Sequence, residues 1–335
     1  MKAMVIRQHG GIDQIRYEEN YPDPVPGPGE VVVAVGATSL NYHDLFTLKG
    51  MPGIKVPMPM IMGIDVAGTI ASVGPGVGEW KSGDRVLIDP INREQYRIIG
   101  EMYEGGLAQM LKVPTHQLIK LPASISFEDA AALPVAYGTA YRMMVARGGV
   151  KKGERVLILG ASGGVGTCCV QLAKMVGAEV VACASSEDKL QRLRKIGADH
   201  TINYVETDFM DEVHRRFGKP RANGDSNGVG VVINFTGGDT WVKSLRCLQR
   251  YGRMLTCGAT AGYDPKTDIR FIWTYELSIV GSNGWERQDL IDLLRLTESR
   301  KITPVIDHVF PLAETRSAFA KLEKRDVCGK VIVKP

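Results

Sequence analysis

Clustered glycines interrupt an apolar run near the middle of the chain. Residues 155–159 are mostly apolar, and the run then breaks into Gly-Ala-Ser-Gly-Gly-Val-Gly at 160–166 before a helical pattern begins. A strand, a tight loop and a helix in this order present unpaired backbone N–H groups and the positive end of the helix dipole. A pyrophosphate fits there, so the spacing favours a dinucleotide ligand. The expected contacts within the loop are Ala161, Ser162, Gly163, Gly164, Val165 and Gly166.

More strand patterns alternate with helical patterns after this loop. They occupy residues 179–184, 196–203, 229–234 and 252–258, and they end in Gly, Ser, Thr or Asn. This alternation predicts an α/β fold with a doubly wound parallel sheet, in which ligands bind at the carboxyl ends of the strands.

The end of the second strand indicates which dinucleotide is bound. Ala184 stands where a carboxylate would accept hydrogen bonds from an adenosine ribose. Ser185, Ser186 and Lys189 follow, and hydroxyl groups with a nearby cation favour a 2′-phosphate. We therefore expect NADP(H) rather than NAD(H). The alternative is that a serine only caps the next helix while Lys189 is solvated, and the two roles are compatible.

Composition excludes several classes of protein. The chain has 335 residues, 44% of them hydrophobic, which is enough to bury the cores of two domains. A net charge of +4 is spread without a basic block, so nucleic-acid binding has no specific support. The N-terminus lacks a signal-peptide core, no apolar run reaches membrane-spanning length, and the six cysteines form no CxxC. We expect a cytoplasmic protein with no membrane or metal partner.

The sequence on the two sides of residue 125 differs in the secondary structure that it predicts. Before residue 125 the sequence has short strands and Gly/Pro-rich turns, and residues 133–145 form a long helical pattern. The last strand pattern, 329–333, is expected to rejoin the β-rich part. We predict one domain from 1–125 and 282–335 and a sheet domain from 126–281.

The order of these pieces resembles the medium-chain dehydrogenase/reductase superfamily over essentially the whole chain. The resemblance rests on the segments 28–33, 63–68, 83–86, 160–166 and 329–331. It implies a GroES-like β-rich catalytic domain, a Rossmann cofactor domain and an active site in the cleft between them. It also implies a homodimer or homotetramer, with residues 277–280 as the edge that joins two cofactor sheets.

The zinc ligands of that family are missing. The positions where zinc-dependent members carry Cys, His and a further Cys or His read Asn41, Ile64 and an apolar region around Ala131. Such a site would bind zinc very poorly. The sequence Asn41-Tyr42-His43-Asp44 is similar to the Asn-x-x-Asp of the zinc-free quinone oxidoreductase and enoyl reductase branch.

Without a metal, hydride addition to a conjugated alkene or quinone is easier than reduction of an isolated carbonyl, and hydrogen-bond donors stabilise the resulting enolate. The catalytic candidates are Asn41, Tyr42 and His43. Family position implies that Asn41 donates to the substrate oxygen or fixes the ribose, and an imidazole at 43 can act as a general acid. The alternatives are a turn cap for Asn41, packing for Tyr42 and a backbone-bonded ring for His43, with Asp44 structural.

The resemblance also implies further coenzyme contacts. Thr139 would approach the diphosphate, Tyr204 the 2′-phosphate, and Lys330 would add charge there or stand at a sheet edge. The remaining contacts are expected at Gly237, Gly258, Thr260, Ser282 and Asn283.

These observations together lead us to expect a zinc-independent NADPH-dependent oxidoreductase. Its substrate would be a small-molecule enone, quinone or other carbonyl compound. Two alternatives stay open, namely an alcohol dehydrogenase or aldehyde reductase that uses His43 or Tyr42 as proton donor, and a non-enzymatic NADPH-binding sensor.

Overall fold

The chain divides into two compact units. The computed structural model describes residues 1–51, 55–223 and 227–335. Unit 1 comprises Met1–Ala136 and Leu290–Pro335, and unit 2 comprises Tyr137–Asp289. Both boundaries expected from the sequence lie earlier in the chain. The first differs because α2 (Phe127–Ala131) packs on the strands of unit 1, where the Phe127 ring lies 4.6 Å from the guanidinium carbon of Arg85.

Unit 1 is built on β-strands, as the Val-rich and Gly/Pro-punctuated sequence predicts. Its largest sheet has the order β10-β6-β5-β3-β18-β17, with β9 also paired to β3, and smaller sheets are formed by β2-β1-β4 and β7-β8. The strands are β1 (Ala3–Ile6), β2 (Arg16–Glu18), β3 (Glu30–Leu40), β4 (Met60–Ile61), β5 (Asp65–Val73), β6 (Arg85–Ile88), β7 (Ile91–Asn92), β8 (Arg97–Ile98), β9 (Met110–Pro114), β10 (Leu118–Lys120), β17 (Ile306–Pro311) and β18 (Lys330–Lys334).

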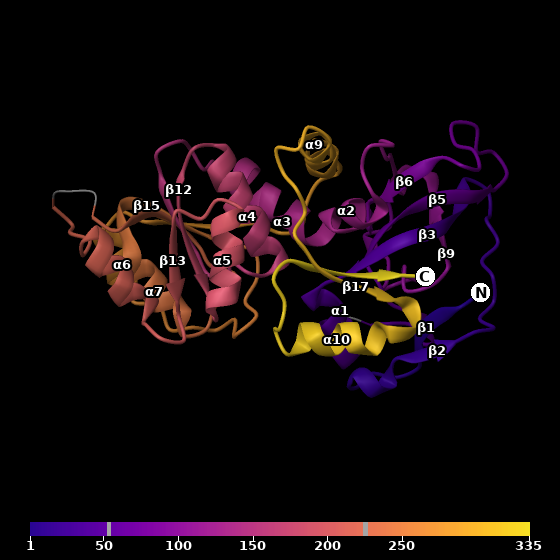
Figure 1. The fold of residues 1–335 in the computed structure, drawn as a ribbon, viewed down its shortest axis with the longest axis horizontal. Helices are drawn as coiled ribbons and strands as arrows, with labels where there is room; N and C mark the ends of the chain where they lie inside the picture. Colours follow the sequence, from indigo (N-terminus) through magenta and orange to yellow (C-terminus); the bar gives the residue numbers. More distant parts are fainter. Residues whose placement is uncertain (52–54, 224–226) are drawn as a thin grey trace. The chain divides into compact units, whose positions relative to one another are not determined.

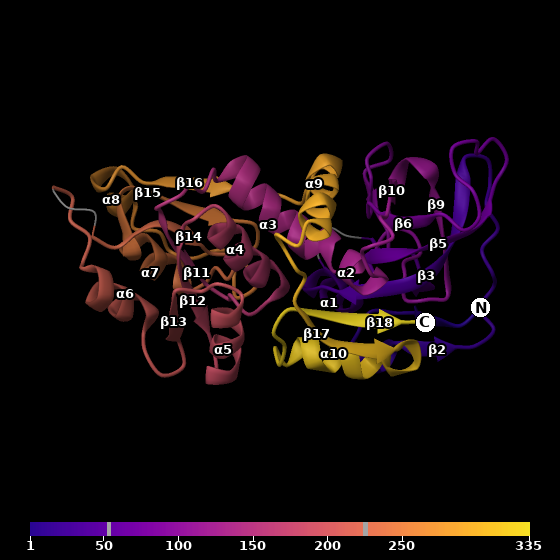
Figure 2. The same ribbon diagram turned by 45° about the horizontal axis from the view of Figure 1, so that its top comes forward.

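Two helices cover one side of this sheet. Helices α1 (Tyr42–Lys49) and α10 (Thr315–Glu323) pack on each other, and α10 lies along β18 (Figure 2). Leu48, Phe319 and Val331 belong to the core that they share with β1 and β4. The C-terminal strand therefore returns to the first domain, as expected from its sequence.

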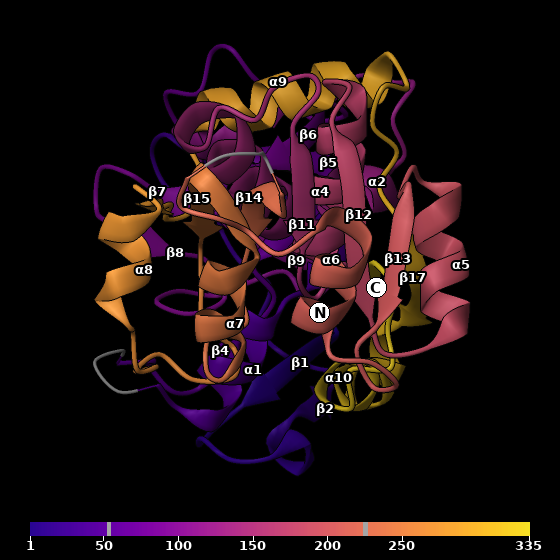
Figure 3. The same ribbon diagram turned by 90° about the vertical axis from the view of Figure 1, so that its left-hand side faces the viewer.

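Unit 2 contains a six-stranded parallel sheet of order β13-β12-β11-β14-β15-β16. Figure 3 shows β13, β12, β11, β14 and β15 in this order from right to left. The strands are β11 (Arg155–Ile158), β12 (Glu179–Ala184), β13 (His200–Asn203), β14 (Val229–Ile233), β15 (Leu248–Thr256) and β16 (Ser278–Gly281). The predicted doubly wound parallel sheet is confirmed, with the change of direction between β11 and β14.

Helices lie on both faces of the parallel sheet. Figure 1 shows α4 and α5 on one face and α6 and α7 on the other. The helices of this part of the chain are α3 (Thr139–Tyr141), α4 (Gly164–Met175), α5 (Glu187–Lys195), α6 (Phe209–Phe217), α7 (Thr240–Cys247) and α8 (Ile269–Thr274), and α9 (Arg287–Glu298) leads back to unit 1. Wide helical turns, η3 (Leu133–Gly138) and η4 (Arg142–Arg147), extend α3 on both sides, where one long helix was predicted.

Neither a membrane span nor a disulfide is found in the described part of the chain. Its helices are all too short or too polar to cross a bilayer. All six cysteines are free thiols, and burial raises the pKa of Cys168, Cys169 and Cys247 well above its ordinary value.

Candidate active site and coenzyme site

The three expected catalytic residues lie at the start of α1. Asn41 follows β3 in an extended conformation and is the residue just before the helix. Asp44 Oδ2 accepts a hydrogen bond of 2.8 Å from the Asn41 backbone N–H, and the Asp44 N–H donates to Asn41 O at 3.1 Å. This reciprocal arrangement fixes the start of the helix, so the local Asn-x-x-Asp sequence sets the direction of residues 41–43.

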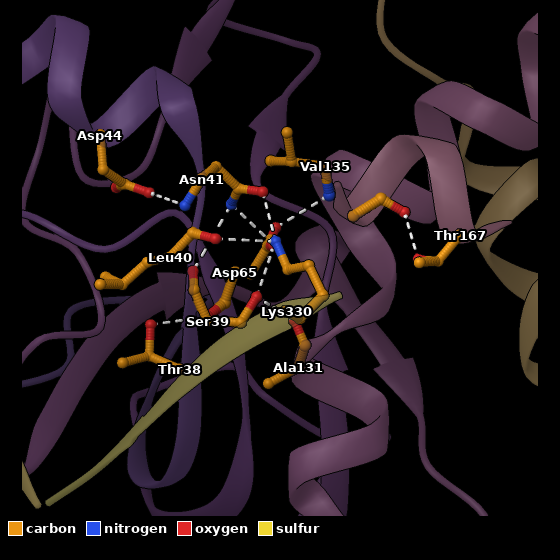
Figure 4. A network of polar contacts seen from close by, with 11 residues as sticks. Thr38, Ser39, Leu40, Asn41, Asp44, Asp65, Ala131, Val135, Thr167 and Lys330 are labelled. Atoms are coloured by element: carbon orange, nitrogen blue, oxygen red, sulfur yellow. Dashed lines mark hydrogen bonds and ion pairs between the residues drawn. The ribbon is translucent and has the colours of Figure 1, made fainter. Parts of the chain in front are cut away.

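A buried ammonium group lies beside Asn41 (Figure 4). Lys330, at the start of β18, is 2% exposed. Its Nζ donates to Leu40 O at 3.0 Å, to Asp65 Oδ2 at 3.3 Å and to Asn41 Oδ1. The antiparallel pairing of β18 with β3, in which Val331 lies opposite Leu40, brings this lysine from the far end of the chain.

Asp65 neutralises the charge of Lys330. The carboxylate is fully buried, and its Oδ2 accepts hydrogen bonds from Asn41 Nδ2 at 2.8 Å and from Ser39 Oγ at 2.9 Å. Its Oδ1 accepts from the Val135 N–H at 2.9 Å. A buried ion pair is tolerated when its remaining polar atoms are satisfied in this way. We call Ser39, Asn41, Asp44, Asp65 and Lys330 the α1 cluster.

The α1 cluster already uses most of the Asn41 amide. Its oxygen accepts from Lys330, one amide hydrogen is donated to Asp65, and the side chain is 6% exposed. The two charged partners also assign the amide oxygen and nitrogen. The oxygen is therefore not available to a ligand. The amide nitrogen also donates to Ser39 O at 3.5 Å, so a substrate oxygen that accepts from Asn41 would replace this long hydrogen bond.

The position of Lys330 corrects an expectation. It is no sheet-edge lysine, because β18 pairs with β17 on one side and β3 on the other. Its ammonium group is buried within unit 1 and bonded to Leu40, Asn41 and Asp65, so it is not available to a 2′-phosphate. Burial lowers the pKa of Lys330, and the negative charges of Asp65 and Asp44 oppose that shift.

Zinc does not fit the residues at the positions of the family ligands. Ile64 is apolar and 1% exposed, and the Asn41 oxygen is bound to an ammonium group that would repel a metal ion. Within residues 1–51, 55–223 and 227–335, no three His, Cys, Asp or Glu side chains are grouped as a metal site requires.

His43 contacts a buried carboxylate from another segment. Its Nε2 lies against Oε2 of Glu101, and the two side chains are 32% and 2% exposed. Burial lowers the pKa of His43, but the hydrogen bond and charge of Glu101, with the charge of Asp44, outweigh it and raise the pKa above its ordinary value. The contact with Glu101 therefore favours the imidazolium form of His43 over the neutral ring.

Asp44 is fully buried, and its Oδ1 has no hydrogen-bond partner within the described residues. Burial raises its pKa to about 6; the Asn41 hydrogen bond opposes this shift and the charge of Asp65 adds to it. Asp44 therefore caps the helix and is also a titratable group near neutral pH.

Tyr42 faces α10 and the segment after it. The Arg325 Nε donates to the Tyr42 hydroxyl at 2.9 Å, and the Phe46 ring lies edge-on at 6.4 Å from the Tyr42 ring centroid. The ring also packs against the core of unit 1. These contacts favour the packing alternative for Tyr42.

The glycine-rich loop of unit 2 has the geometry that its sequence predicts. Gly160 has φ +62°, and α4 begins at Gly164. A Cβ on Gly166 would lie 2.4 Å from Gly160 O, so only glycine allows the helix to approach the loop this closely. The free N–H groups of the first turn of α4 suit a pyrophosphate.

The end of β12 carries the residues expected to bind a 2′-phosphate. Ser186 caps α5 by accepting a hydrogen bond from the Lys189 N–H at 3.5 Å, and Lys189 Nζ lies 3.4 Å from Ser185 Oγ. Tyr204 is 47% exposed, and its N–H donates to Ala184 O at 3.2 Å. The structure thus brings Ser185, Ser186, Lys189 and Tyr204 to one corner of the sheet. Ser186 also caps the helix, so both expected roles are compatible.

The other expected coenzyme residues in unit 2 lie in or beside its helices and strand ends. Thr139 begins α3 and is 9% exposed. The Gly237 N–H donates to Asn234 Oδ1, and the Thr260 N–H donates to Phe235 O. The Ser282 N–H donates to Thr256 O, whereas its Oγ is buried without a partner among the described residues, so a bound ligand could supply one. Gly258 follows β15, and Asn283 follows Ser282 after β16.

The sequence analysis did not identify Glu101 and gave Asp65 no defined role. Glu101 lies in an irregular segment with no periodic pattern, and only the tertiary structure brings it to His43. For Asp65 the signal was present, because a carboxyl group in an apolar strand needs a cationic partner.

Comparisons with known proteins agree with the fold. Residues 27–123 match the family model described as "Alcohol dehydrogenase GroES-like domain", and residues 164–299 match "Zinc-binding dehydrogenase". An acryloyl-coenzyme A reductase of Sulfurisphaera tokodaii is 34% identical over 100% of both chains. A crotonyl-CoA reductase of Streptomyces avermitilis is 32% identical over 93% of this chain and 80% of its own length.

Solved structures place the chain in the same group. An NAD-dependent alcohol dehydrogenase has a TM-score of 0.91 with 35% identity over 100% of both chains. The 2-octenoyl-CoA carboxylase reductase CinF, solved with NADP and 2-octenoyl-CoA, has a TM-score of 0.85 with 29% identity over 99% of this chain and 87% of its own. The chain belongs to the medium-chain dehydrogenase/reductase superfamily, with its GroES-like domain and Rossmann domain.

Proposed function

We propose that this protein is an NADPH-dependent oxidoreductase that reduces an α,β-unsaturated carbonyl compound or a quinone by hydride transfer, without zinc. The observation that carries the proposal is the α1 cluster. Asn41 and Ile64 stand at the family's metal-ligand positions, and a lysine ammonium group is bound to Asn41 instead. Electrophilic activation then has to come from protein hydrogen-bond donors and from the conjugation of the substrate.

NADP(H) is the proposed coenzyme. Ala184 leaves no carboxylate to repel a 2′-phosphate, and Ser185, Ser186 and Lys189 gather at the same corner. Two similar solved structures, of a crotonyl-CoA carboxylase/reductase and of CinF, contain NADP. We propose that the loop of residues 161–166 holds the pyrophosphate, with contacts from Thr139, Tyr204, Gly237, Gly258, Thr260, Ser282 and Asn283.

The reaction needs a proton as well as a hydride. When bound, NADPH supplies a hydride to the β-carbon of the substrate, and the resulting enolate must then be protonated. His43 is the proposed acid because its ring is partly exposed and its protonated form is stabilised. Asn41 would donate to the substrate oxygen in place of its long hydrogen bond of 3.5 Å to Ser39 O. Tyr42 is the weaker candidate because its hydroxyl contacts Arg325.

The relatives suggest which unsaturated compounds to test first. The acryloyl- and crotonyl-CoA reductases are named for enoyl thioesters. A thioester carbonyl conjugated to an alkene accepts hydride at the β-carbon without a metal, so enoyl-CoA compounds head the substrate panel. Quinones follow the same conjugate mechanism.

Alcohol dehydrogenase activity is the second candidate, favoured by the similarity to an NAD-dependent alcohol dehydrogenase. An isolated carbonyl would need strong protonation by His43 or Tyr42 to replace the Lewis acid. The two functions differ in their substrate and in their response to zinc.

One assay separates them. NADPH oxidation is followed at 340 nm with acryloyl-CoA, crotonyl-CoA, simple enones, quinones and aldehydes, with chelator present and metal content measured on the same sample. We expect turnover of the conjugated substrates in metal-free protein. Oxidation of simple alcohols restored by zinc would instead establish the dehydrogenase, and tight NADPH binding without turnover of any substrate would indicate a sensor.

We also propose that the protein assembles through β16 as a homodimer, or as a homotetramer of such dimers. This strand is at the end of the sheet order, and its Ile279 is 40% exposed. An unpaired edge of this kind can extend a sheet across two copies. Light scattering after size exclusion should give twice or four times the chain mass, and a monomer would refute the assembly.

A further inference from the structure

His43 and Glu101 meet although they are far apart in the sequence. His43 lies in the first turn of α1, whereas Glu101 lies in a turn after β8. The turn is closed by a hydrogen bond of 2.8 Å from the Gly100 N–H to Tyr103 O. A Cβ on Gly100 would lie 2.9 Å from backbone atoms of Gly63, so the turn packs against the chain that leads to Asp65. The backbone beside Glu101 is therefore fixed.

The carboxylate of Glu101 is buried with few hydrogen bonds to compensate for the loss of water. Its side chain is 2% exposed, and within the described part of the chain its hydrogen bond is to His43 Nε2. Burying a carboxylate costs several kcal/mol unless a charged or hydrogen-bonding partner compensates. A half-buried histidine is that partner only when its Nε2 carries a proton.

This contact selects one nitrogen of the imidazole. When Nε2 donates to Glu101, the ring nitrogen left for a ligand is Nδ1. Nδ1 has no polar partner among the residues that the structure describes. Since the side chain is 32% exposed, the ring is not enclosed by the protein. In the imidazolium form Nδ1 carries the second proton.

We propose that Glu101 is a positioning residue, which holds His43 through Nε2 so that Nδ1 is the atom that donates the proton to the substrate. The inference rests on the proposed reduction of a conjugated carbonyl compound. In that step, hydride from NADPH forms the C–H bond at the β-carbon and NADP⁺ is left. The Nδ1–H bond breaks as a C–H bond forms at the α-carbon, His43 becomes neutral with its proton on Nε2, and a solvent proton restores Nδ1–H.

The surrounding charges support this assignment. Glu101 faces the ring from its turn and Asp44 faces it from α1, and both favour the imidazolium. Asp65 and Lys330 act on Asp44 in opposite directions. Removing the Glu101 charge should therefore make His43 release its proton at lower pH.

The first test compares Glu101→Gln with His43→Gln, measured as the NADPH-saturated holoenzyme with crotonyl-CoA. His43→Gln should lower kcat by about 100-fold or more, the usual worth of a general acid. Glu101→Gln should lower kcat by a smaller factor, leave the Kd for NADPH unchanged, and move the alkaline limb of the kcat profile to lower pH. Glu104→Gln, in the same segment but bonded to the Tyr21 hydroxyl, is the matched control and should behave as the parent.

Non-additivity tests whether Glu101 acts through His43. The double variant His43→Gln/Glu101→Gln should be no slower than His43→Gln alone, because Glu101 affects the rate only by holding the His43 ring. It also retains two neutral side chains that can hydrogen-bond each other, which protects the fold. Independent losses that multiply in the double variant, or a pH profile unchanged by Glu101→Gln, would overturn the inference.

A direct readout keeps this result separate from the proposed function. Nitrogen-15 spectra of the histidine rings, with His43 assigned from His43→Gln, report which nitrogen keeps its proton in the neutral ring. We expect Nε2–H in the parent protein and loss of that preference in Glu101→Gln. A neutral ring protonated on Nδ1 in the parent would reject the pair even in an active enzyme. If no conjugated substrate is turned over, the proposed function fails, and the spectra alone decide the His43–Glu101 pairing.

Discussion

The glycine-rich loop of unit 2 and the α1 cluster of unit 1 both lie where a strand gives way to a helix, but they are built differently. The loop is made of consecutive residues, 160–166, and offers backbone N–H groups. The α1 cluster is made of side chains from β3, α1, β5 and β18, and its charges are buried and paired. A backbone site depends on steric room, whereas a side-chain site depends on the balance of its charges.

The sharpest test of this difference is removal of the buried cation. Lys330→Met leaves the Asp65 carboxylate buried without its ammonium partner, which should lower the free energy of unfolding by roughly 3–5 kcal/mol. Urea denaturation at pH 7 measures the loss. Lys334→Met is the control on the same strand, because Lys334 pairs with Glu128 on the surface and its ion pair is worth about 1 kcal/mol or less.

Removing both charges separates the cost of an unpaired buried charge from the cost of altered packing. Asp65→Asn/Lys330→Met buries no net charge and should regain part of the stability lost in Lys330→Met. If the single variant loses less than about 1 kcal/mol, the buried pair does not hold unit 1 together in the way the comparison requires.

Asp44 tests the charge balance through pH. Its pKa is about 6 in the fold against an ordinary value of 3.8, so between those two pH values the folded protein holds a proton that the unfolded chain releases. The stability due to protonated Asp44 is therefore present at low pH and is lost as pH rises through 6. Relative to the parent, Asp44→Asn should gain about 2 kcal/mol in unfolding free energy between pH 4 and pH 8.

The measurement is a pair of urea titrations at those two pH values. Asp264→Asn, on an exposed segment of unit 2, controls for the loss of one negative charge. A difference between Asp44→Asn and the parent that stays constant with pH would show that Asp44 titrates alike in the folded and unfolded chains.

The glycine-rich loop should respond to volume instead of charge. Gly166→Ala places a Cβ 2.4 Å from Gly160 O, so it should destabilise unit 2 by roughly 1–3 kcal/mol, as overpacking usually does. Gly163→Ala would meet its nearest atom, Gly160 O, at an ordinary 3.6 Å and should leave stability unchanged. If Gly163→Ala nevertheless weakens NADPH binding, the ligand itself occupies that space; equal stability losses in both variants would contradict the steric difference.

The same contrast explains what the sequence could predict. Residues 160–166, Ser186 and the alternating strands are local patterns, so the doubly wound sheet and the helix caps followed from short segments of sequence. Lys330 contacts Asn41, which is hundreds of residues away in the sequence, and this contact depends on the register of two strands. Glu101 contacts His43, which is tens of residues away, and this contact depends on an irregular turn. Lys330 was therefore expected at the coenzyme, and Glu101 was not expected at all, whereas His43 was identified from its place after Asn41.

The smallest expected effect tests the coenzyme corner at the end of β12. Lys189→Ala removes the cation beside Ser185 without touching the Ser186 cap, which uses the backbone N–H of residue 189. A lost charged hydrogen bond of about 1.5 kcal/mol corresponds to roughly tenfold weaker NADPH binding, with NADH binding unchanged. Lys195→Ala, an exposed lysine at the end of the same helix, controls for the loss of positive charge. Parallel loss of affinity for both coenzymes would mean that Lys189 contributes to the general field of unit 2, and that the 2′-phosphate is recognised by other groups.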